Sequence, residues 1–279
     1  MTDAFGRALA ADLVLAESGV DQRHLTGPFD IIGDVHGCID ELVTLFGRLG
    51  YGVEFHWDGD VRRVRTTAPA GRTAVFVGDL IDRGPSSADV LRIAMAMQVA
   101  RHGLAVIGNH DVKLLRWLRG EKPMLTHALQ ATVFEIEAEP RAFRDEVTHY
   151  LAALPLYLWL AGGALVVAHA GIEAARIGRM SPAIRRFCIF GDTDGKSDHG
   201  GLPVRYNWAA RYHGHAEVVY GHTPVAIATR VNRTVCIDTG CCFGGTLTAL
   251  RWPEGEVVSV PATREHVPRL REFGLPPER

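Results

Sequence analysis

The stretch FDIIGDVHGCID, residues 29–40, places a short apolar run directly before an acidic residue and a histidine. The run ends at Gly33, and Asp34 and His36 follow with one hydrophobic residue between them. A short apolar run that stops at glycine is typical of a buried strand. In α/β sheets, ligands bind beyond the carboxyl ends of the strands. The stretch therefore predicts a strand whose end presents a carboxylate and an imidazole to a ligand.

The same arrangement recurs four times further along the chain, in GDLIDRG, GNHD, HAG and GHT. Each apolar run ends in a polar residue that can bind metal, close to a glycine that gives the backbone room to turn. With GDVHG, the strings supply Asp34, His36, Asp79, Asn109, His110, His169 and His222. A single polar residue at a strand end usually caps a turn. Five strand ends that all carry such a residue close to a glycine are poorly explained by a structural role alone. Carboxylate, amide and imidazole ligands together suit manganese, iron or zinc.

Helical spacing follows several of these runs, which predicts an α/β fold. The predicted strands cover residues 29–33, 73–78, 104–107, 164–168 and 217–220, and the predicted helices cover residues 40–49, 86–101 and 110–118. A hairpin is expected over 51–67, a helical cap over 120–150, and an antiparallel sheet over 229–260. The chain is predicted to form one domain with an insertion.

Composition limits the function. The chain has 279 residues, of which 47% are hydrophobic, so it can bury a large core. A net charge of −2 argues against a partner such as long duplex nucleic acid, which requires many phosphate contacts. The five cysteines show no disulfide framework, and no apolar stretch approaches the ~18 residues of a spanning helix. The sequence predicts a soluble, cytoplasmic protein without a membrane partner.

The ordered motifs resemble those of the calcineurin-like metallophosphoesterases, in particular the phosphoprotein-phosphatase branch. The resemblance spans residues 34–222 and continues more weakly to 262. It implies a central β-sandwich flanked by helices with a small helical cap. It also implies two divalent metal ions, manganese first, with iron, zinc or nickel as alternatives. The predicted parts are an extension (1–27), the metallophosphoesterase domain (28–262, with the cap at 120–150) and a C-terminal tail (263–279).

The resemblance assigns a role to each motif residue. Asp34 and His36 would hold the first metal, and Asp79 would bridge both. The second metal would be held by Asn109, His169 and His222. His110 would be the general acid, oriented by Asp82, and Arg83 would grip a phosphate oxygen. The family attacks with a metal-bound hydroxide and forms no phosphoenzyme.

Three further residues are predicted to bind substrate. Asn109 would contact it in addition to the second metal. Arg205 could be a second residue that binds phosphate. The alternative interpretation is an ordinary surface arginine. Asp238, in the string IDTGC, is expected to be functional, and its alternative is a carboxylate that caps a turn.

Two narrower groups are similar to this chain through GPFDIIGDVHGC, GNHDVKLLRWLRG and the segment from VVYGHTPV onward. They are the phosphatase module of bacterial polynucleotide kinase–phosphatases, which repair RNA, and stand-alone bacterial diadenosine tetraphosphate hydrolases. A polynucleotide 2′,3′-phosphatase is the first hypothesis, a bis(5′-nucleosyl)-tetraphosphatase the second and a serine/threonine protein phosphatase the third. The partner would be a phosphorylated RNA end or a nucleotide. Because the chain has no GxxxxGK[ST] loop, any repair kinase or ligase would be a separate protein.

Some signals are discounted. The complete ligand set, with His110 and Arg83, argues against a non-enzymatic metal-binding scaffold. His213 and His215 are expected to be exposed. The adjacent Cys241 and Cys242 are expected to be buried packing residues, since neighbouring cysteines rarely reach disulfide geometry.

Overall fold

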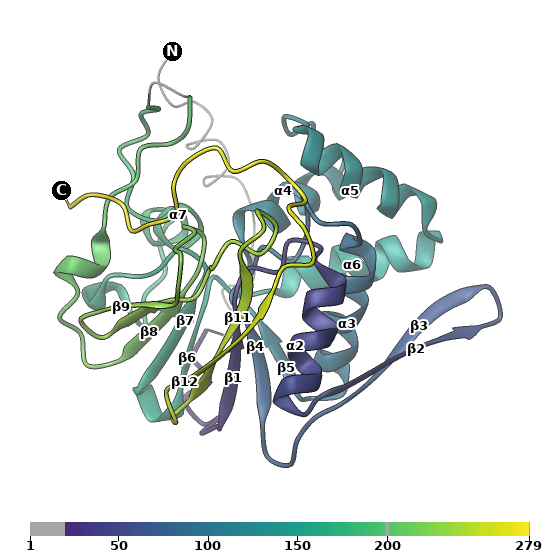
Figure 1. Ribbon diagram of the computed structural model, residues 1–279, viewed down its shortest axis with the longest axis horizontal. Helices are drawn as coiled ribbons and strands as arrows, with labels where there is room; N and C mark the ends of the chain where they lie inside the picture. Colours follow the sequence, from purple (N-terminus) through teal and green to yellow (C-terminus); the bar gives the residue numbers. More distant parts are fainter. Residues whose placement is uncertain (1–19, 199–200, 279) are drawn as a thin grey trace.

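The computed structural model describes residues 20–198 and 201–278, and the fold consists of two facing β-sheets flanked by helices (Figure 1). The first sheet has the strand order β12-β11-β1-β4-β5. Its strands are β1 (Phe29–Ile32), β4 (Thr73–Phe76), β5 (Gly103–Ala105), β11 (Thr246–Trp252) and β12 (Glu256–Pro261). β1, β4 and β5 are parallel, whereas β11 runs antiparallel to β1. The predicted sandwich is therefore present.

The second sheet has the order β6-β7-β8-β10-β9. Its strands are β6 (Tyr157–Leu160), β7 (Leu165–Ala168), β8 (Glu217–Tyr220), β9 (Thr229–Val231) and β10 (Thr234–Cys236). β7, β8 and β10 are parallel. The sheets share an apolar layer that includes Ile31 and Val75 of the first and Val167 and Val219 of the second. Parallel strands that are buried on both faces consist of consecutive apolar residues, which is why they can be recognised in the sequence.

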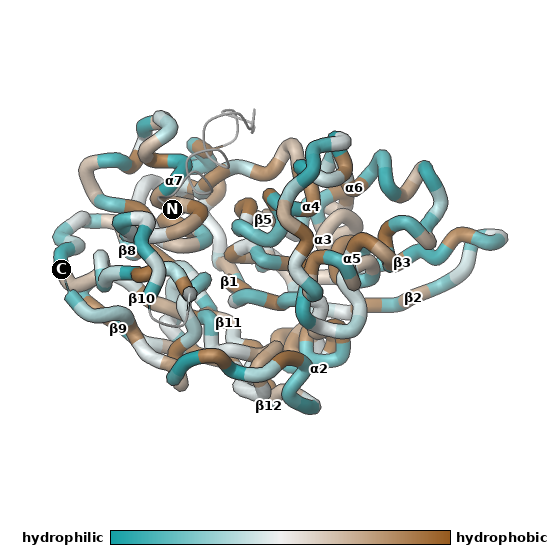
Figure 2. The backbone as a smooth tube through the Cα atoms, turned by 90° about the horizontal axis from the view of Figure 1, so that it is seen from above, coloured by the Kyte–Doolittle hydropathy of each residue, from teal (hydrophilic) through white to brown (hydrophobic). Residues whose placement is uncertain are grey.

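The helices cover the outer faces and build the cap. They are α2 (Ile39–Leu49), α3 (Ser87–Val99), α4 (Asn109–Leu118), α5 (His127–Ala138), α6 (Arg141–Ala153) and α7 (Pro182–Phe190), with short 3-10 segments η1 (Ala161–Gly163), η2 (Ala174–Arg176) and η3 (Trp208–Arg211). α2 packs on β11 and β12, and α3 packs on β5. α5 and α6 pack on α3 and α4 at one end of the molecule (Figures 1 and 2). The segment predicted as a cap is thus helical.

A two-stranded hairpin, β2 (Gly52–Asp58) and β3 (Val61–Thr67), projects beyond α3 (Figure 1). The hairpin confirms the prediction over 51–67. The strand β6 and the helix α7 were not predicted from the sequence. β6 is short and lies directly after the cap. In the sequence its apolar residues therefore resemble a continuation of the helical region.

Both ends of the described chain return to the sandwich. Trp159 N donates to Val20 O at 2.8 Å, and Gln22 N donates to Trp159 O at 2.9 Å, so the start of the chain runs along β6. At the other end, Asn207 N donates to Pro277 O at 2.9 Å. Residues 1–19 of the predicted extension lie outside the described residues. Within the described part of the chain, no helix combines the length and apolar character needed to cross a membrane.

Candidate metal centre

The predicted ligands lie where six parallel strands of the two sheets end. Each ligand follows its strand within a few residues, so the sandwich brings them together from distant parts of the sequence. The residues placed there are Asp34, His36, Asp79, Asn109, His110, His169, His222 and Asp238. Two groups have potential ligand atoms within 4.8 Å of one another: His36, Asp79 and His110, and Asp79, His169 and His222. Asp79 belongs to both groups, as expected of a bridging ligand.

His36 is oriented as a ligand. Its Nδ1 lies 2.9 Å from the carbonyl oxygen of Ile81 and therefore carries the proton. Its Nε2 lies 3.5 Å from Asp79 Oδ2 and 2.7 Å from a guanidinium nitrogen of Arg83. Since arginine can only donate, Nε2 of His36 presents a lone pair. This nitrogen already faces a positive group, which is the electrostatic setting of a metal ligand.

His169 has the same design. Its Nδ1 lies 3.0 Å from the carbonyl oxygen of Val77, which leaves the lone pair on Nε2. That nitrogen lies 3.1 Å from Asn109 Oδ1, 3.0 Å from His222 Nδ1 and 3.5 Å from Asp79 Oδ1. Oxygen and nitrogen acceptors converge on one point. A divalent cation would satisfy all of them, so these residues fit a metal ion.

The charges of the centre lead to the same conclusion. Burial raises the pKa of Asp34 well above its usual value, and the negative charges of Asp238 and Asp79 raise it further. Burial also raises the pKa of Asp238 to about 6. Burial lowers the pKa values of His36 and His222, so both imidazoles are neutral, the form that binds metal. Buried carboxylates that repel one another beside neutral imidazoles favour a bound cation.

Asp34 lies slightly apart from the two groups. Its two carboxylate oxygens accept the backbone N–H of His222 at 3.3 and 3.1 Å. A side chain on Gly221 would place its Cβ 1.8 Å from Asp34 Oδ1. The absence of a side chain at residue 221 therefore lets the two strand ends approach. Asp34 remains in the position predicted for a first-metal ligand, and its role stays a prediction.

His110 and Asp82 form a buried pair beside the ligands. His110 Nδ1 lies 2.5 Å from Asp82 Oδ2, and its Nε2 lies 3.1 Å from the guanidinium of Arg83. The other oxygen, Asp82 Oδ1, accepts the hydroxyl of Thr132 at 2.6 Å. Burial raises the pKa of Asp82 to about 6, and the Thr132 hydrogen bond opposes that rise. The predicted orientation of His110 by Asp82 therefore has a geometric basis.

The remaining predicted residues lie around the centre. Arg83 contacts two imidazoles, so its guanidinium is already inside the site. Arg205 donates to His222 O at 3.0 Å and to Thr223 Oγ1 at 3.3 Å, and burial lowers its pKa to about 10. Arg205 is therefore more than an ordinary surface arginine. Asp238 Oδ1 accepts the N–H of Gly240 at 3.0 Å, so this carboxylate caps a turn while lying near Asp34.

Two supporting residues were not identified from the sequence. Asp111 accepts the backbone N–H groups of Asp79 and Gly108 at 2.9 Å each and that of Leu80 at 3.0 Å. Asp111 therefore fixes the turn that carries Asp79, the predicted bridging ligand. The sequence signal that could have identified Asp111 was its position in GNHD, next to His110. Thr132 lies in α5, where nothing in the sequence distinguishes it from other helical residues.

The discounted signals agree with the structure. His213 and His215 are exposed. The five cysteines are buried and free.

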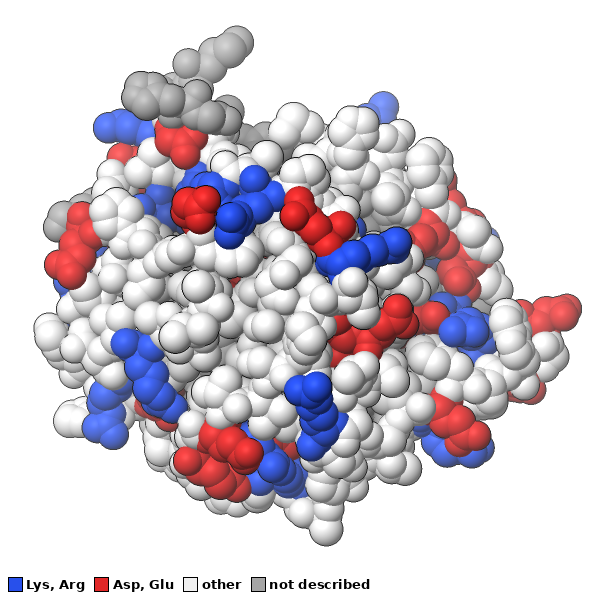
Figure 3. Space-filling view, in the orientation of Figure 1, with Lys and Arg blue, Asp and Glu red and all other residues white. Residues whose placement is uncertain are grey.

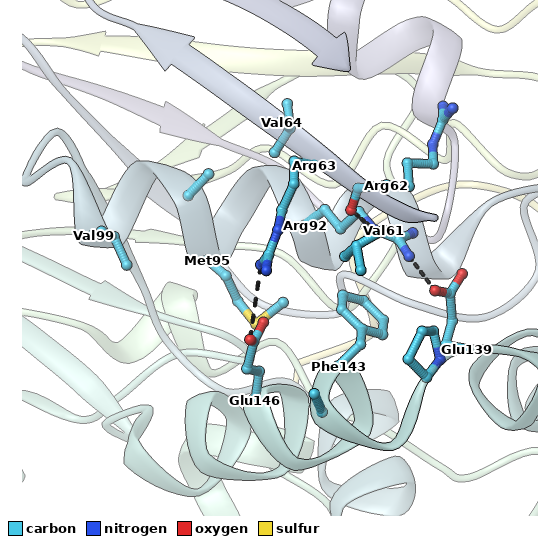
Figure 4. Close-up of a pocket in the computed structure, with 13 residues that line it drawn as sticks. Val61, Arg62, Arg63, Val64, Arg92, Met95, Val99, Glu139, Phe143 and Glu146 are labelled. Atoms are coloured by element: carbon cyan, nitrogen blue, oxygen red, sulfur yellow. Dashed lines mark hydrogen bonds and ion pairs between the residues drawn. The ribbon is translucent and has the colours of Figure 1, made fainter. Parts of the chain in front are cut away.

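A separate cavity of about 230 Å³ lies between the hairpin, α3 and α6 (Figure 4). Its arginines are paired: Arg62 and Arg92 with Asp89 at 2.9 and 3.0 Å, and Arg63 with Glu146 at 3.9 Å. Their charges are already compensated. The cavity contains none of the predicted metal ligands and is not the candidate centre.

Comparison with known proteins identifies the family. The model of the calcineurin-like phosphoesterases matches residues 27–226, which is most of the chain. The chain therefore belongs to the calcineurin-like phosphoesterases and is a hydrolase of phosphoester bonds.

Individual relatives are more specific. A Geobacillus sp. (strain WCH70) protein named bis(5′-nucleosyl)-tetraphosphatase PrpE, with the qualifier asymmetrical, is 43% identical over 249 residues, covering 88% of this chain and 98% of the relative. The Bacillus subtilis (strain 168) protein of the same name is 42% identical over 243 residues, covering 84% and 95%.

Solved structures support the fold. The crystal structure of a proposed diadenosine tetraphosphatase aligns with a TM-score of 0.63 at 24% identity, covering 87% of this chain and 97% of that one. A serine/threonine phosphatase from Saccharomyces cerevisiae aligns with a TM-score of 0.57 at 12% identity, covering 98% and 89%. At these identities the likeness concerns the fold alone.

Proposed function

We propose that this protein is a bis(5′-nucleosyl)-tetraphosphatase that cleaves its substrate asymmetrically, into a nucleoside triphosphate and a nucleoside monophosphate. The observation that carries the proposal is the 43% identity, over 88% of the chain, with a relative of that name. This activity was the second of the sequence-based hypotheses. The relatives favour it over the RNA-end phosphatase, which was the first.

The residues present suit such a substrate. When bound, two divalent ions would activate a water molecule and neutralise phosphate charge. Asp34, His36 and Asp79 would hold one ion, and Asp79, Asn109, His169 and His222 the other. Manganese remains the first candidate. Arg83 and Arg205 would hold further phosphate oxygens, because a guanidinium matches the geometry of phosphate.

Arg83 also connects substrate binding to the state of His110. In the structure its guanidinium donates to Nε2 of both His36 and His110. We propose that a polyphosphate draws this guanidinium onto its own oxygens. The lone pair of His110 would then be released from a positive neighbour, which favours its protonated form. Asp82 would hold the imidazole in place while Nε2 gives its proton to the leaving oxygen.

The nature of the leaving group distinguishes the hypotheses. A nucleoside triphosphate leaves as a stable anion and needs little protonation, whereas the ribose hydroxyl of an RNA end needs much more. General acid catalysis follows such differences in basicity. His110→Ala should therefore reduce the rate less on a dinucleoside tetraphosphate than on an RNA terminal phosphate.

The test is turnover of diadenosine tetraphosphate with manganese, followed by separation of the nucleotide products. Equal amounts of ATP and AMP are expected, and two equivalents of ADP would refute asymmetric cleavage. RNA ending in a 2′,3′-cyclic or terminal phosphate and a phosphothreonine peptide are assayed in parallel, with Asp79→Ala as the inactive control. A higher kcat/KM on the RNA would restore the RNA-end hypothesis.

A further inference from the structure

A second cluster of metal-binding side chains lies apart from the predicted dinuclear ligands. Potential ligand atoms of Cys38, Glu41 and Cys241 all lie within 4.8 Å of one another. Cys38 is 0% exposed, and Glu41 and Cys241 are each 2% exposed. No function considered above uses any of these three residues.

The three side chains come from two distant parts of the chain. Cys38 precedes α2 and Glu41 lies in its first turn, so their spacing of three residues places both on one face of the helix. Cys241 lies in the loop between β10 and β11. Its neighbour Cys242 points elsewhere, with its sulfur 4.0 Å from the Arg83 guanidinium. The two adjacent cysteines therefore have different surroundings.

The cluster contains polar atoms without partners. Glu41 Oε1 accepts the backbone N–H and the hydroxyl of Thr263, both at 2.7 Å. Glu41 Oε2 is buried and has no hydrogen-bond partner in the described structure, and neither has His266 Nε2. His266 Nε2 lies 3.8 Å from Glu41 Oε1, beyond hydrogen-bond distance. A buried carboxylate without a cation is costly, and such groups are normally paired or bound to metal.

The chemistry of the set selects the ion. Two thiolates, a carboxylate and an imidazole are the ligands of a closed, four-coordinate zinc site. Zinc–sulfur bonds of about 2.3 Å and zinc–oxygen bonds of about 2.0 Å give tetrahedral edges of roughly 3.3 to 3.8 Å. The ligand atoms of Cys38, Glu41 and Cys241 already lie within 4.8 Å of one another, so these three need only a small inward movement.

We propose that Cys38, Glu41 and Cys241 bind a zinc ion that is separate from the two catalytic metals, with His266 as the fourth ligand. Binding would release one proton from each thiol. His266 Nδ1 accepts from Arg264 Nε at 3.3 Å, so ligation through Nε2 requires the proton to move to Nδ1 and this exposed arginine to turn away.

The site would have a structural purpose. Cys38 lies two residues after His36, and Cys241 lies three residues after Asp238. The His266 backbone N–H donates to Cys242 O at 3.0 Å, which brings the segment beyond β12 to the same place. A zinc ion would thus fasten the start of α2, the β10–β11 loop and the C-terminal segment beneath the catalytic centre.

Cobalt substitution of the full-length protein tests the proposal, because a thiolate–cobalt bond gives a charge-transfer absorption in the near ultraviolet. The band should appear in the wild type and lose at least half of its intensity in Cys241→Ser, because one of the two thiolates is removed. It should persist in Cys188→Ser, a buried cysteine of α7, and in Asp79→Ala, which removes the catalytic bridge. Absence of the band in the wild type, or a band of undiminished intensity in Cys241→Ser, would overturn the proposal.

A second variant keeps the test decisive if Cys241→Ser does not fold. Glu41→Gln preserves the size of the side chain. In the Asp79→Ala background, which removes the catalytic sites, its zinc affinity, measured by competition with a chromophoric chelator, should fall about tenfold or more. An unchanged affinity would overturn the proposal. So would a disulfide between Cys38 and Cys241 in the unreduced protein, detected by mass spectrometry. None of these readouts depends on the substrate of the enzyme.

Discussion

The hydroxyl of Thr132 should control the pH at which the enzyme becomes active. It donates to Asp82 Oδ1 at 2.6 Å, and Asp82 in turn holds His110. Thr132→Val preserves the shape of this buried side chain but removes the donor. A hydrogen bond to a charged group contributes roughly 1.5–3 kcal/mol. One pKa unit corresponds to about 1.4 kcal/mol, so losing the bond should raise the pKa of Asp82 by about one to two.

The effect of this pKa rise on the reaction rate depends on pH. With a pKa of about 6, the Asp82 carboxyl is mostly ionised at neutral pH. A rise of one to two would leave roughly a tenth to a half of it ionised at pH 7. The rate of Thr132→Val should therefore fall about twofold to tenfold at pH 7. The deficit should shrink as the pH rises, because the ionised form returns above the new pKa.

The assay is kcat/KM for the tetraphosphate as a function of pH, since this parameter reports the groups of the free enzyme. The acid limb of the Thr132→Val profile should move to higher pH. Thr148→Val is the matched control: Thr148 lies in α6 of the same cap and donates to Arg144 O within its own helix. Superimposable profiles for wild type and Thr132→Val would refute the reasoning, as would a deficit that is equal at all pH values.

Three further variants test the centre itself. His110→Ala should lower kcat by about 10²–10⁴-fold, nearer the lower limit for a tetraphosphate, and elemental analysis should find the metals still bound. Asp79→Ala should empty both catalytic sites, so two bound catalytic metals in that variant would contradict the bridging role. Gly221→Ala should disrupt metal binding because its Cβ would lie 1.8 Å from Asp34 Oδ1, while Gly47→Ala, with nothing within 4 Å, should leave it intact.

The distribution of charged side chains on the face of the molecule shown in Figure 3 is consistent with a small substrate. Acidic and basic side chains are mixed across it, without a large patch of one sign. A protein that tracks a long polynucleotide backbone needs a continuous basic surface. The partly buried arginines at the centre, Arg83 and Arg205, are instead suited to a few phosphate groups.

Some features could be predicted because they are local in the sequence. Each predicted metal ligand lies within a few residues of the strand that positions it, and the strand itself is recognisable as a short apolar run. The helix α2 likewise shows its periodicity directly. β6 was not predicted because it has only four residues and follows a helical region. Four residues are too few to show a pattern that distinguishes a strand from the end of that region.

The sequence by itself determined the α/β class and the family and predicted the metal ligands, since these features depend on residue types at short spacing. Only the tertiary structure decided which distant side chains hold the buried carboxylates in place. Thr132 meets Asp82 across 50 residues, and Thr263 meets Glu41 across 222. Such contacts have no local signal because the packing of the two sheets and the cap, rather than chain spacing, brings the partners together.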